Sequence, residues 1–401
     1  MSHDDRSTHA KASRSRRPGS QSALRRRNQQ RLTEQLLKGG PATQAELARR
    51  TGLSTATVSN IVKSMADEGL VSIAPVTSSG RRALSVRYTG DGAIAAGIDF
   101  GRTHVRVVLA NTGYHVVAQD EVPLPLGHEA AESISAAAVL LEKLLAGAGL
   151  SRSQLSGAGA GIPGPIDLRS GKVIQGAILP EWAGIKLREQ LQQALQVPVF
   201  VDNDANLGAL AQLTWGEQGG VSNLVFVKIG SGIGAGLVLD GRLFHGGFGV
   251  TGEIGHVSIN EHGIVCRCGN RGCLETVAST TTMTESLSRG RTRPVTVADI
   301  LNQAAAGDPA TLRVIDDAGM AIGRALGNVA NLVSPDAIVI GGPLTGLGEL
   351  LLEPIRRSLL RHAVPVIGDN IVLAMSQLSS RAEALGAAAL VFQDASTPVN
   401  S

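Results

Sequence analysis

Apolar residues recur at helical spacing in the first quarter of the chain and in short strand-like runs after residue 90. Helical spacing predicts amphipathic helices, whereas brief apolar runs bounded by turn residues predict buried strands. Residues 94–99 and 105–110 form such runs, and residues 224–239 and 337–340 repeat the pattern further on. The sequence therefore predicts a small helical domain followed by a larger α/β body.

The helical segment begins with a helix predicted over residues 23–37, with Leu24, Leu32 and Leu36 or Leu37 as its apolar stripe. A short helix follows, which Thr43 caps with Glu46 at the reciprocal capping-box position. Gly52 supplies a tight turn, and Ser54 caps a further helix from Thr55 to about Glu68. This order is typical of a helix-turn-helix, although an ordinary helical hairpin has the same pattern.

The outer face of the last of these helices is small and hydroxyl-rich, because Val58, Ile61, Val62 and Met65 are predicted to face inward. In a helix-turn-helix this face enters the major groove. Strands predicted over residues 71–76 and 84–88 flank a basic hairpin tip, which indicates a wing that contacts DNA. The candidate DNA-binding residues are Thr55, Thr57, Ser59, Asn60 and Lys63 on the helix and Arg81 and Arg82 in the wing.

Charge supports a nucleic acid partner at one end of the chain. Residues 1–90 contain 16 Lys/Arg and 6 Asp/Glu, whereas the remainder contains 21 and 28. A basic end on an acidic body is typical of DNA contact through that end. Residues 1–22, polar and without periodicity, are predicted to be a disordered basic tail.

The sequence shows no apolar run long enough to span a membrane, and we expect no secretory leader because its first residues are polar and basic. Its three cysteines all lie between residues 266 and 273. Such clustering argues against a secreted disulfide framework and for a reducing compartment. We therefore expect a cytoplasmic protein without a membrane partner.

Two glycine-rich turns in the body are predicted phosphate loops. Asp99 ends the first strand and is followed by Gly101 and Thr103, which resembles the first phosphate loop of the sugar kinase/actin superfamily. There the carboxylate holds a metal ion through water and backbone amides face phosphate. A second hairpin contains Gly230, Gly232 and Gly234, and a third glycine pair, Gly341 and Gly342, stands where that architecture has its adenosine loop. Two such hairpins suggest a duplicated βββαβα unit, although a glycine-rich hairpin is also compatible with a simple turn.

Acidic residues follow the strand predicted at residues 199–201. Asp204 begins the next helix, a position from which a carboxylate can act as general base toward a sugar hydroxyl. Asp202 and Asn206 have the alternative role of capping that helix. The stiff segment 161–167, which contains two prolines, is either a cleft wall or a turn.

The cysteines suggest a metal centre. Three thiolates, from Cys266, Cys268 and Cys273, and the imidazole of His256 make a closed four-ligand set for structural zinc. A redox switch that pairs Cys266 with Cys268 is the alternative. Glu253 and Glu275 flank the loop, so a metal ion there holds two carboxylates in fixed positions.

Together, segments 230–236, 246–256 and 266–275 resemble the ROK family of repressors and sugar kinases, over residues 23–392. The resemblance implies an α/β fold: a winged helix-turn-helix (23–90), then a two-lobed actin/sugar kinase-like (ribonuclease H-like) body with a zinc loop. Its N-terminal lobe comprises residues 91–215 and 375–392, and its C-terminal lobe residues 216–374.

The resemblance also implies site roles. His256, Cys266, Cys268 and Cys273 match the family's zinc ligands, and Asn203, Asp204, Glu253, His256 and Glu275 match residues that bind sugar hydroxyls. Asp204 matches the catalytic base of the kinases, and Asp99, Gly101 and Thr103 match their first phosphate loop. Two departures stand out. Arg102 replaces a glycine of the ATP loop, and Ile178 stands where relatives often have a sugar-binding Asn.

Three functions fit these observations. The first is a sugar-responsive repressor of carbohydrate genes, a homodimer or homotetramer that binds operator DNA and has no kinase activity. The second is an ATP- and Mg²⁺-dependent hexose kinase, with Asp204 as its base, that carries a DNA-binding domain. The third is a constitutive DNA-binding protein whose sugar cleft is vestigial.

Overall fold

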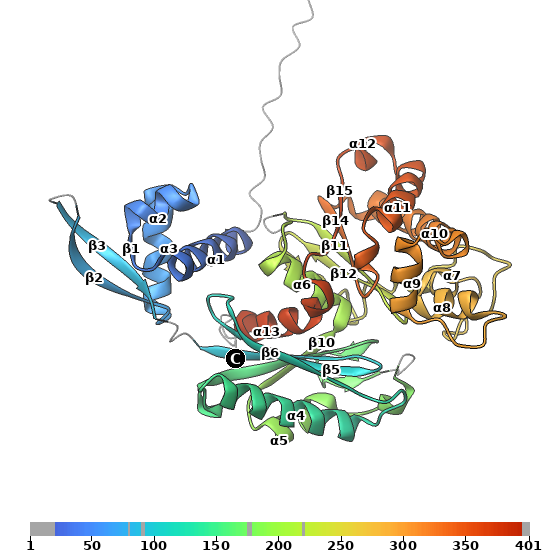
Figure 1. Ribbon diagram of the computed structural model, residues 1–401, viewed down its shortest axis with the longest axis horizontal. Helices are drawn as coiled ribbons and strands as arrows, with labels where there is room; N and C mark the ends of the chain where they lie inside the picture. Colours follow the sequence, from blue (N-terminus) through green and yellow to red (C-terminus); the bar gives the residue numbers. More distant parts are fainter. Residues whose placement is uncertain (1–20, 79–80, 90–92, 175–178, 219–220, 395–401) are drawn as a thin grey trace, which may run out of the picture.

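A computed structural model describes residues 21–78, 81–89, 93–174, 179–218 and 221–394. The N-terminal domain lies to one side of a two-lobed body (Figure 1). Its elements are α1 (Gln21–Gly39), β1 (Ala42–Thr43), α2 (Gln44–Thr51), α3 (Thr55–Asp67), β2 (Val71–Ser78) and β3 (Arg81–Tyr88). The strands form a sheet of order β1-β3-β2, so this domain is a winged helix-turn-helix.

Local capping sets the helix boundaries of this domain. Thr43 and Glu46 form the predicted capping box, with the Thr43 N–H donating to the Glu46 carboxylate at 2.7 Å. Gly52 ends α2 in the left-handed region at φ 69°, and the Ser54 hydroxyl accepts from the Thr57 N–H at 3.1 Å. The inward residues predicted for α3 are buried against Leu32, Leu36 and Leu47. The predicted caps and the predicted inward face of α3 are thus confirmed.

Two predictions about this domain are wrong. Leu24 does not join the apolar stripe of α1, because its side chain is 51% exposed beyond the small core around Leu32. Arg81 and Arg82 do not lie in the hairpin loop. They begin β3 and pair with Ser78 and Thr77 of β2, since the ladder extends further than the sequence pattern indicates. Residues 79–80, at the tip, lie outside the described residues.

The N-terminal lobe is built on a five-stranded sheet of order β10-β7-β4-β5-β6. Its strands are β4 (Ile94–Phe100), β5 (His104–Asn111), β6 (Val116–Pro123), β7 (Leu155–Ile162) and β10 (Val199–Asn203). Helices α4 (Ala130–Gly147) and α5 (Leu187–Leu195) cover one face (Figure 1). A small hairpin, β8 (Ile166–Asp167) with β9 (Lys172–Val173), and short 3₁₀ turns at Arg152–Gln154 and Pro180–Trp182 complete the connections. Burial on both faces explains why most residues of β4 and β5 are apolar.

The C-terminal lobe repeats this arrangement. Its sheet, read from the opposite edge, has the order β15-β14-β11-β12-β13. The strands are β11 (Leu224–Ile229), β12 (Ile233–Leu239), β13 (Arg242–Leu243), β14 (Ala337–Gly341) and β15 (Val372–Met375). In both lobes an antiparallel set of three strands is followed by two parallel strands. The expected duplication of a βββαβα unit is confirmed.

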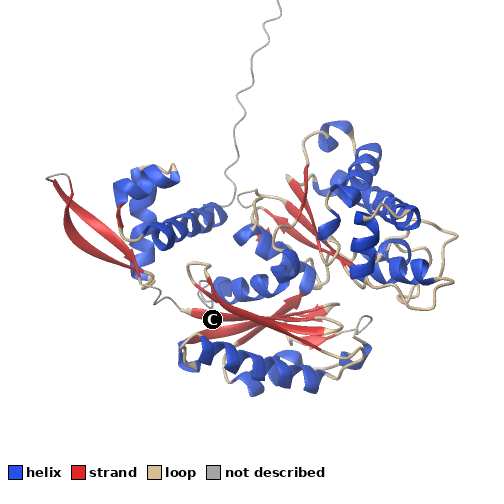
Figure 2. Ribbon diagram, viewed as in Figure 1, coloured by secondary structure: helices blue, strands red, loops and turns tan. Residues whose placement is uncertain are grey.

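Helices cover the outer side of this second sheet (Figure 2). They are α7 (Glu275–Ala278), α8 (Thr280–Ser288), α9 (Val297–Ala305), α10 (Pro309–Val333), α11 (Glu349–His362) and α12 (Pro365–Gly368). Short 3₁₀ turns at Ile254–His256, Thr345–Leu347 and Ser379–Arg381 complete the connections. The long helix α10 packs along α11. Their contact faces are aliphatic, as the low aromatic content requires.

Two helices lie between the lobes, α6 (Asp204–Trp215) and α13 (Ala382–Asp394). The alanine-rich α13 lies directly on β4 and β7, where a Cβ at Gly97 or Gly159 would overlap the helix backbone. Glycine on the sheet and alanine on the helix therefore permit this close approach. Nearly all of α6 is buried, so its two ends are held firmly between the lobes.

The DNA-binding domain contacts the body through α1, which packs against α6. The Asn111 side-chain amide donates to the Tyr88 hydroxyl across the same junction. A Cβ at Gly113 would lie 3.3 Å from Thr33 Oγ1 and 3.6 Å from the Leu70 side chain, so this turn rests on the domain. Among the helices described, none is long and apolar enough to cross a membrane.

Candidate ligand cleft and metal centre

A cleft of about 430 Å³ opens between the lobes. It is lined by both glycine turns, the start of α6 and residues beside the cysteine loop. The sequence-predicted residues that line it are Asp99, Gly101, Thr103, Asn203, Asp204, Gly230, Gly232, Gly234, Glu253, His256, Glu275 and Gly342. Gly341 does not line it but packs against the ring of Phe226.

Asn203 and Asp204 stand where β10 passes into α6. Asn203 is the N-cap of α6: its side-chain oxygen accepts from the Ala205 N–H at 2.8 Å, and its amide donates to the Gly164 carbonyl at 3.0 Å. The stiff segment 161–167 thus forms part of the cleft wall through Pro163, Gly164 and Pro165. Backbone groups therefore already form hydrogen bonds with both the oxygen and the nitrogen of the Asn203 side-chain amide.

Asp204 is buried at the first position of α6. Its Oδ1 accepts from the Ala205 N–H at 2.8 Å, and its Oδ2 lies 2.8 Å from the ammonium of Lys228. Burial raises the pKa of Asp204, although Lys228 opposes that shift. Asp202 turns away from this pair and binds His245 at 2.8 Å and Asn206 at 2.8 Å. Asp202 and Asn206 are therefore internal supports of the helix start.

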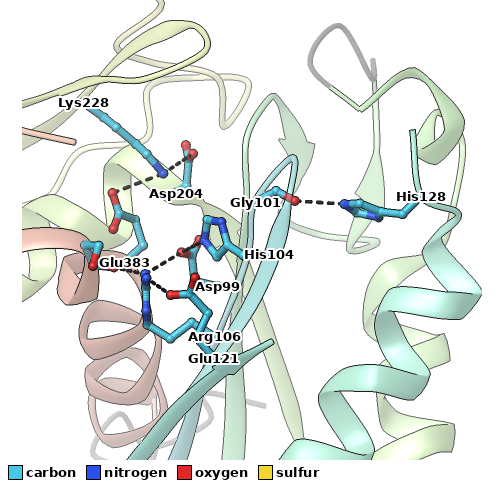
Figure 3. Close-up of polar contacts among 10 residues, drawn as sticks. Asp99, Gly101, His104, Arg106, Glu121, His128, Asp204, Lys228 and Glu383 are labelled. Atoms are coloured by element: carbon cyan, nitrogen blue, oxygen red, sulfur yellow. Dashed lines mark hydrogen bonds and ion pairs between the residues drawn. The ribbon is translucent and has the colours of Figure 1, made fainter. Parts of the chain in front are cut away.

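Asp99, at the end of β4, lies on the same side of the cleft. His104 donates to its Oδ2 at 3.0 Å, and the Arg106 guanidinium lies 3.6 Å away and also binds Glu121 (Figure 3). Burial alone would raise the pKa of Asp99, but Lys228, His104 and Arg106 lower it to about 2. Asp99 is therefore ionised at neutral pH.

Arg102 lines the phosphate-loop side of the cleft. Its Nε is buried and has no hydrogen-bond partner among the described residues. A guanidinium at this point occupies space that a glycine leaves open to a phosphate. Ile178, the second departure from the kinase pattern, lies outside the described residues.

The cysteine loop brings four ligand atoms together. The side chains of His256, Cys266, Cys268 and Cys273 place one ligand atom each within 4.8 Å of one another. Cys268 Sγ lies 3.7 Å from Cys273 Sγ, and Cys266 Sγ lies 3.7 Å from His256 Nδ1. Tetrahedral zinc with bonds of about 2.3 Å separates two sulfur ligands by roughly 3.8 Å, whereas a disulfide needs about 2.05 Å. The residues fit a closed zinc site.

The metal loop is joined directly to the cleft. Arg267, between two of the cysteines, lies 2.8 Å from the buried carboxylate of Glu275, which also accepts from the Ile233 N–H at 3.2 Å. The second ring nitrogen of His256 lies 3.8 Å from the carboxylate of Glu253. Burial raises the pKa of Glu253. His256 can therefore bind metal through Nδ1 while its other edge faces the cleft.

On the DNA-binding domain, Thr55, Ser59, Asn60 and Lys63 are exposed on one face of α3. Thr57 is partly covered, and its hydroxyl lies 2.8 Å from that of Ser54. This face is free to enter a groove of DNA.

Comparison with known proteins agrees with this organisation. Residues 95–394 match the family model described as the ROK family, and residues 34–82 match that of the MarR family. The chain belongs to the ROK family.

Several ROK relatives are regulators. A xylose repressor from Caldicellulosiruptor bescii is 29% identical over 94% of this chain and 98% of its own length. A solved ROK transcriptional regulator, a homologue of the Escherichia coli MLC protein, superposes with a TM-score of 0.68 at 27% identity over 92% of this chain and 96% of that one. A glucokinase from Halalkalibacterium halodurans is 34% identical over 74% of this chain and 94% of its own length. This ROK protein, with its DNA-binding helix-turn-helix, is a transcriptional regulator.

Sequence reasoning missed several residues of the ROK cleft. Lys228, Glu383, His104 and Arg106 form ion pairs around Asp99 and Asp204, and Arg267 binds Glu275. Lys228 could have been recognised from the sequence as a candidate site residue, because it is the one charged residue within the apolar strand β11. Glu383 is an acid within an alanine-rich helix, which is a comparable signal.

Proposed function

We propose that this protein is a sugar-responsive repressor of carbohydrate uptake or catabolism genes. A sugar binds in the cleft between the lobes, and its hydroxyls donate to the carboxylates of Asp204, Glu253 and Glu275, beside Asn203 and His256. Sugar binding changes the position of one lobe relative to the other, and this movement lowers the affinity of the protein for operator DNA. Two copies of the chain provide the two reading heads that a palindromic operator needs.

The main support for this proposal is the position of helix α6, which extends from the cleft to the DNA-binding domain. The helix begins at Asp204 in the cleft and packs against α1 of the DNA-binding domain. One buried element thus touches both the candidate ligand and the DNA-binding domain. A shift of its first turn has a direct route to α1, because packed elements move as bodies rather than deform continuously.

The chemistry of the lining favours a polyol ligand. The carboxylates of Asp204, Glu253 and Glu275 are hydrogen-bond acceptors, and a sugar presents hydroxyl donors in several directions. The names of the relatives, a xylose repressor and a glucokinase, favour a monosaccharide. Zinc at His256, Cys266, Cys268 and Cys273 is structural in this proposal, since protein atoms fill all its positions.

The decisive experiment combines ligand screening with DNA binding. A panel of hexoses, pentoses and acetylated amino sugars is first screened by thermal shift of the zinc-loaded protein. A sugar that raises Tm should also weaken binding to the protein's own promoter region, measured by fluorescence anisotropy. Glu253→Gln should leave DNA binding intact and blunt the response to that sugar. A response of normal size in Glu253→Gln would remove this residue from the site.

A kinase function remains a second candidate because Asp204 lies in the cleft beside both glycine turns. An ADP-release assay with the same sugars and Mg²⁺–ATP tests it. Turnover that Asp204→Ala abolishes would establish the kinase and contradict a purely regulatory role. We expect no turnover, since Arg102 stands on the phosphate-loop side of the cleft.

A further inference from the structure

The basic side chain of Arg102 lines the cleft but forms no ion pair within the described part of the chain. The other basic residues of the lining each lie against a carboxylate; they are His104, Arg106, Lys228, His256 and Arg267. Arg102 is therefore the basic side chain of this cleft that is left to pair with an anionic ligand.

The hydrogen-bonding state of Arg102 agrees with such a role. Its Nε is buried and has no hydrogen-bond partner among the described residues. A buried donor without an acceptor costs free energy. A guanidinium presents five N–H donors in a planar fork, and this fork matches the oxygens of a phosphate or a carboxylate. A bound anion would supply the acceptor that Nε lacks.

The surroundings of Arg102 suit a phosphate group. Thr103 and Ser231 line the same cleft and carry hydroxyls that can donate to phosphate oxygens. Asp99, the carboxylate nearest to Arg102 in the sequence, already binds His104 at 3.0 Å and lies 3.6 Å from Arg106 (Figure 3). An anion beside Arg102 therefore does not meet an unpaired carboxylate there.

The two lobes offer different chemistry to one ligand. Arg102 follows β4 of the N-terminal lobe, whereas Glu253 and Glu275 belong to the C-terminal lobe. Carboxylates accept hydrogen bonds from hydroxyls, and a guanidinium donates to an anion. A neutral sugar satisfies the carboxylates alone, while a sugar with an anionic group satisfies both lobes and bridges them.

We propose that the cleft takes a phosphorylated monosaccharide, with its phosphate on Arg102 and its hydroxyls on the carboxylates. A phosphate ester fits better than a sugar acid, because its three free oxygens serve the guanidinium fork and neighbouring hydroxyls together. This inference rests on the proposed function, since it names the ligand class of the same cleft. Arg102 is then a specificity residue for the ester.

The test is calorimetry on the zinc-loaded full chain with glucose 6-phosphate, mannose 6-phosphate and ribose 5-phosphate, each compared with its parent sugar. At least one ester should bind at least about tenfold more tightly than its parent. Arg102→Gln should abolish this preference, and Arg102→Lys should keep part of it, because lysine retains the charge without the fork. Arg169→Gln is the matched control: Arg169 is exposed between β8 and β9, outside the cleft lining, so the preference should persist.

A further variant separates the two ends of the ligand. Glu253→Gln should weaken binding of ester and parent alike, and so leave their affinity ratio unchanged. An ester preference that survives Arg102→Gln, or the absence of a preference for every ester, would overturn the inference. In either case a parent sugar that releases DNA leaves the repressor proposal standing.

Two additional ligands test the identity of the anion. Gluconate that binds more tightly than every phosphate ester would overturn the assignment to phosphate. Inorganic phosphate that binds as tightly as the best ester would show an anion site that does not read the sugar, and would overturn the inference as well. An Arg102-dependent ester that leaves DNA binding unchanged would confirm the ligand class and contradict the repressor proposal instead.

Discussion

The guanidinium of Arg267 lies 2.8 Å from the carboxylate of Glu275, and this contact ties the cysteine loop to the wall of the cleft. Arg267 stands between Cys266 and Cys268, whereas Glu275 begins α7. The position of a candidate ligand-binding carboxylate therefore depends on the conformation of the metal loop.

Replacement of Arg267 by Gln should weaken ligand binding. Glu275 would remain buried without its cation, which costs on the order of 1–3 kcal/mol. We expect ligand affinity to fall about tenfold, measured by calorimetry with the sugar identified in the screen. Arg271→Gln is the control, because Arg271 lies in the same loop and its side chain donates to the Gly263 carbonyl at 2.9 Å rather than to Glu275. If the two variants bind the sugar with equal affinity, the contact between Arg267 and Glu275 makes no contribution to ligand binding.

Removal of zinc should destabilise the C-terminal lobe. The four ligand atoms hold together a loop with few apolar contacts of its own, so metal binding contributes to folding directly. Chelation, or Cys268→Ser, should lower Tm by at least about 5 °C. Differential scanning calorimetry, with metal analysis of the same samples, measures this change in Tm. Adding zinc back should restore the Tm of the chelated wild type but not that of Cys268→Ser. A Tm that stays constant after complete zinc loss would show that the loop needs no metal.

Features with local causes could be predicted from the sequence. The capping box of Thr43 and Glu46 and the left-handed Gly52 lie within a few residues of one another, so their pattern determines the turn. The zinc ligands were similarly recognisable, because three of the four lie within eight residues. Fold and duplication followed from strand-like runs and glycine turns at matching places in the two halves.

Features that depend on distant contacts could not be predicted. Lys228 and Glu383 are 155 positions apart, and only the packing of β11 and α13 against α6 brings their charges together. The exposure of Leu24 depends on where the core around Leu32 ends, and the length of the wing depends on pairing between β2 and β3. None of these is encoded in the spacing of apolar residues.

The ion pair of His245 and Asp202 should make stability depend on pH. The hydrogen bond to Asp202, 2.8 Å long, raises the pKa of His245 above its ordinary value despite partial burial. A raised folded-state pKa means that the stabilisation is complete below the unfolded pKa of about 6.5 and is lost as pH rises through the folded value. The pair thus stabilises the protein most on the acid side.

His245→Asn should therefore lower Tm most at about pH 6, by a loss on the order of 1 kcal/mol or roughly 2–4 °C, and progressively less above that pH. Thermal melts across the pH range measure the difference from the wild type. His262→Asn, at an exposed position, should show no such trend. A difference that grows with rising pH would contradict the assignment.

The wing should contribute to DNA binding through phosphate contacts. Arg81→Ala with Arg82→Ala removes two charges, so the slope of log K against log salt should become shallower by about 1.8. Anisotropy titrations at several salt concentrations give this slope. Arg87→Ala is the control, since Arg87 pairs with Ser72 at the base of the same hairpin. An unaltered slope in the double variant would show that Arg81 and Arg82 of the wing make no phosphate contacts.

The junction between Asn111 and Tyr88 should transmit the response from the body to the DNA-binding domain. The Asn111 amide donates to the Tyr88 hydroxyl, while its oxygen accepts from the His115 N–H at 3.0 Å and shapes the turn that rests on α1. Tyr88→Phe removes the hydroxyl that Asn111 contacts across the junction. DNA affinity without ligand should then stay unchanged, whereas the ligand-induced loss of affinity should shrink by about fivefold or more, because coupling between sites is typically 1–3 kcal/mol.

Thr89→Ala provides the control: the Thr89 hydroxyl bonds within the DNA-binding domain, to the Gly69 carbonyl at 2.8 Å, so its loss should leave the response intact. If Tyr88→Phe responds to ligand as the wild type does, the signal passes through α6 and α1 alone.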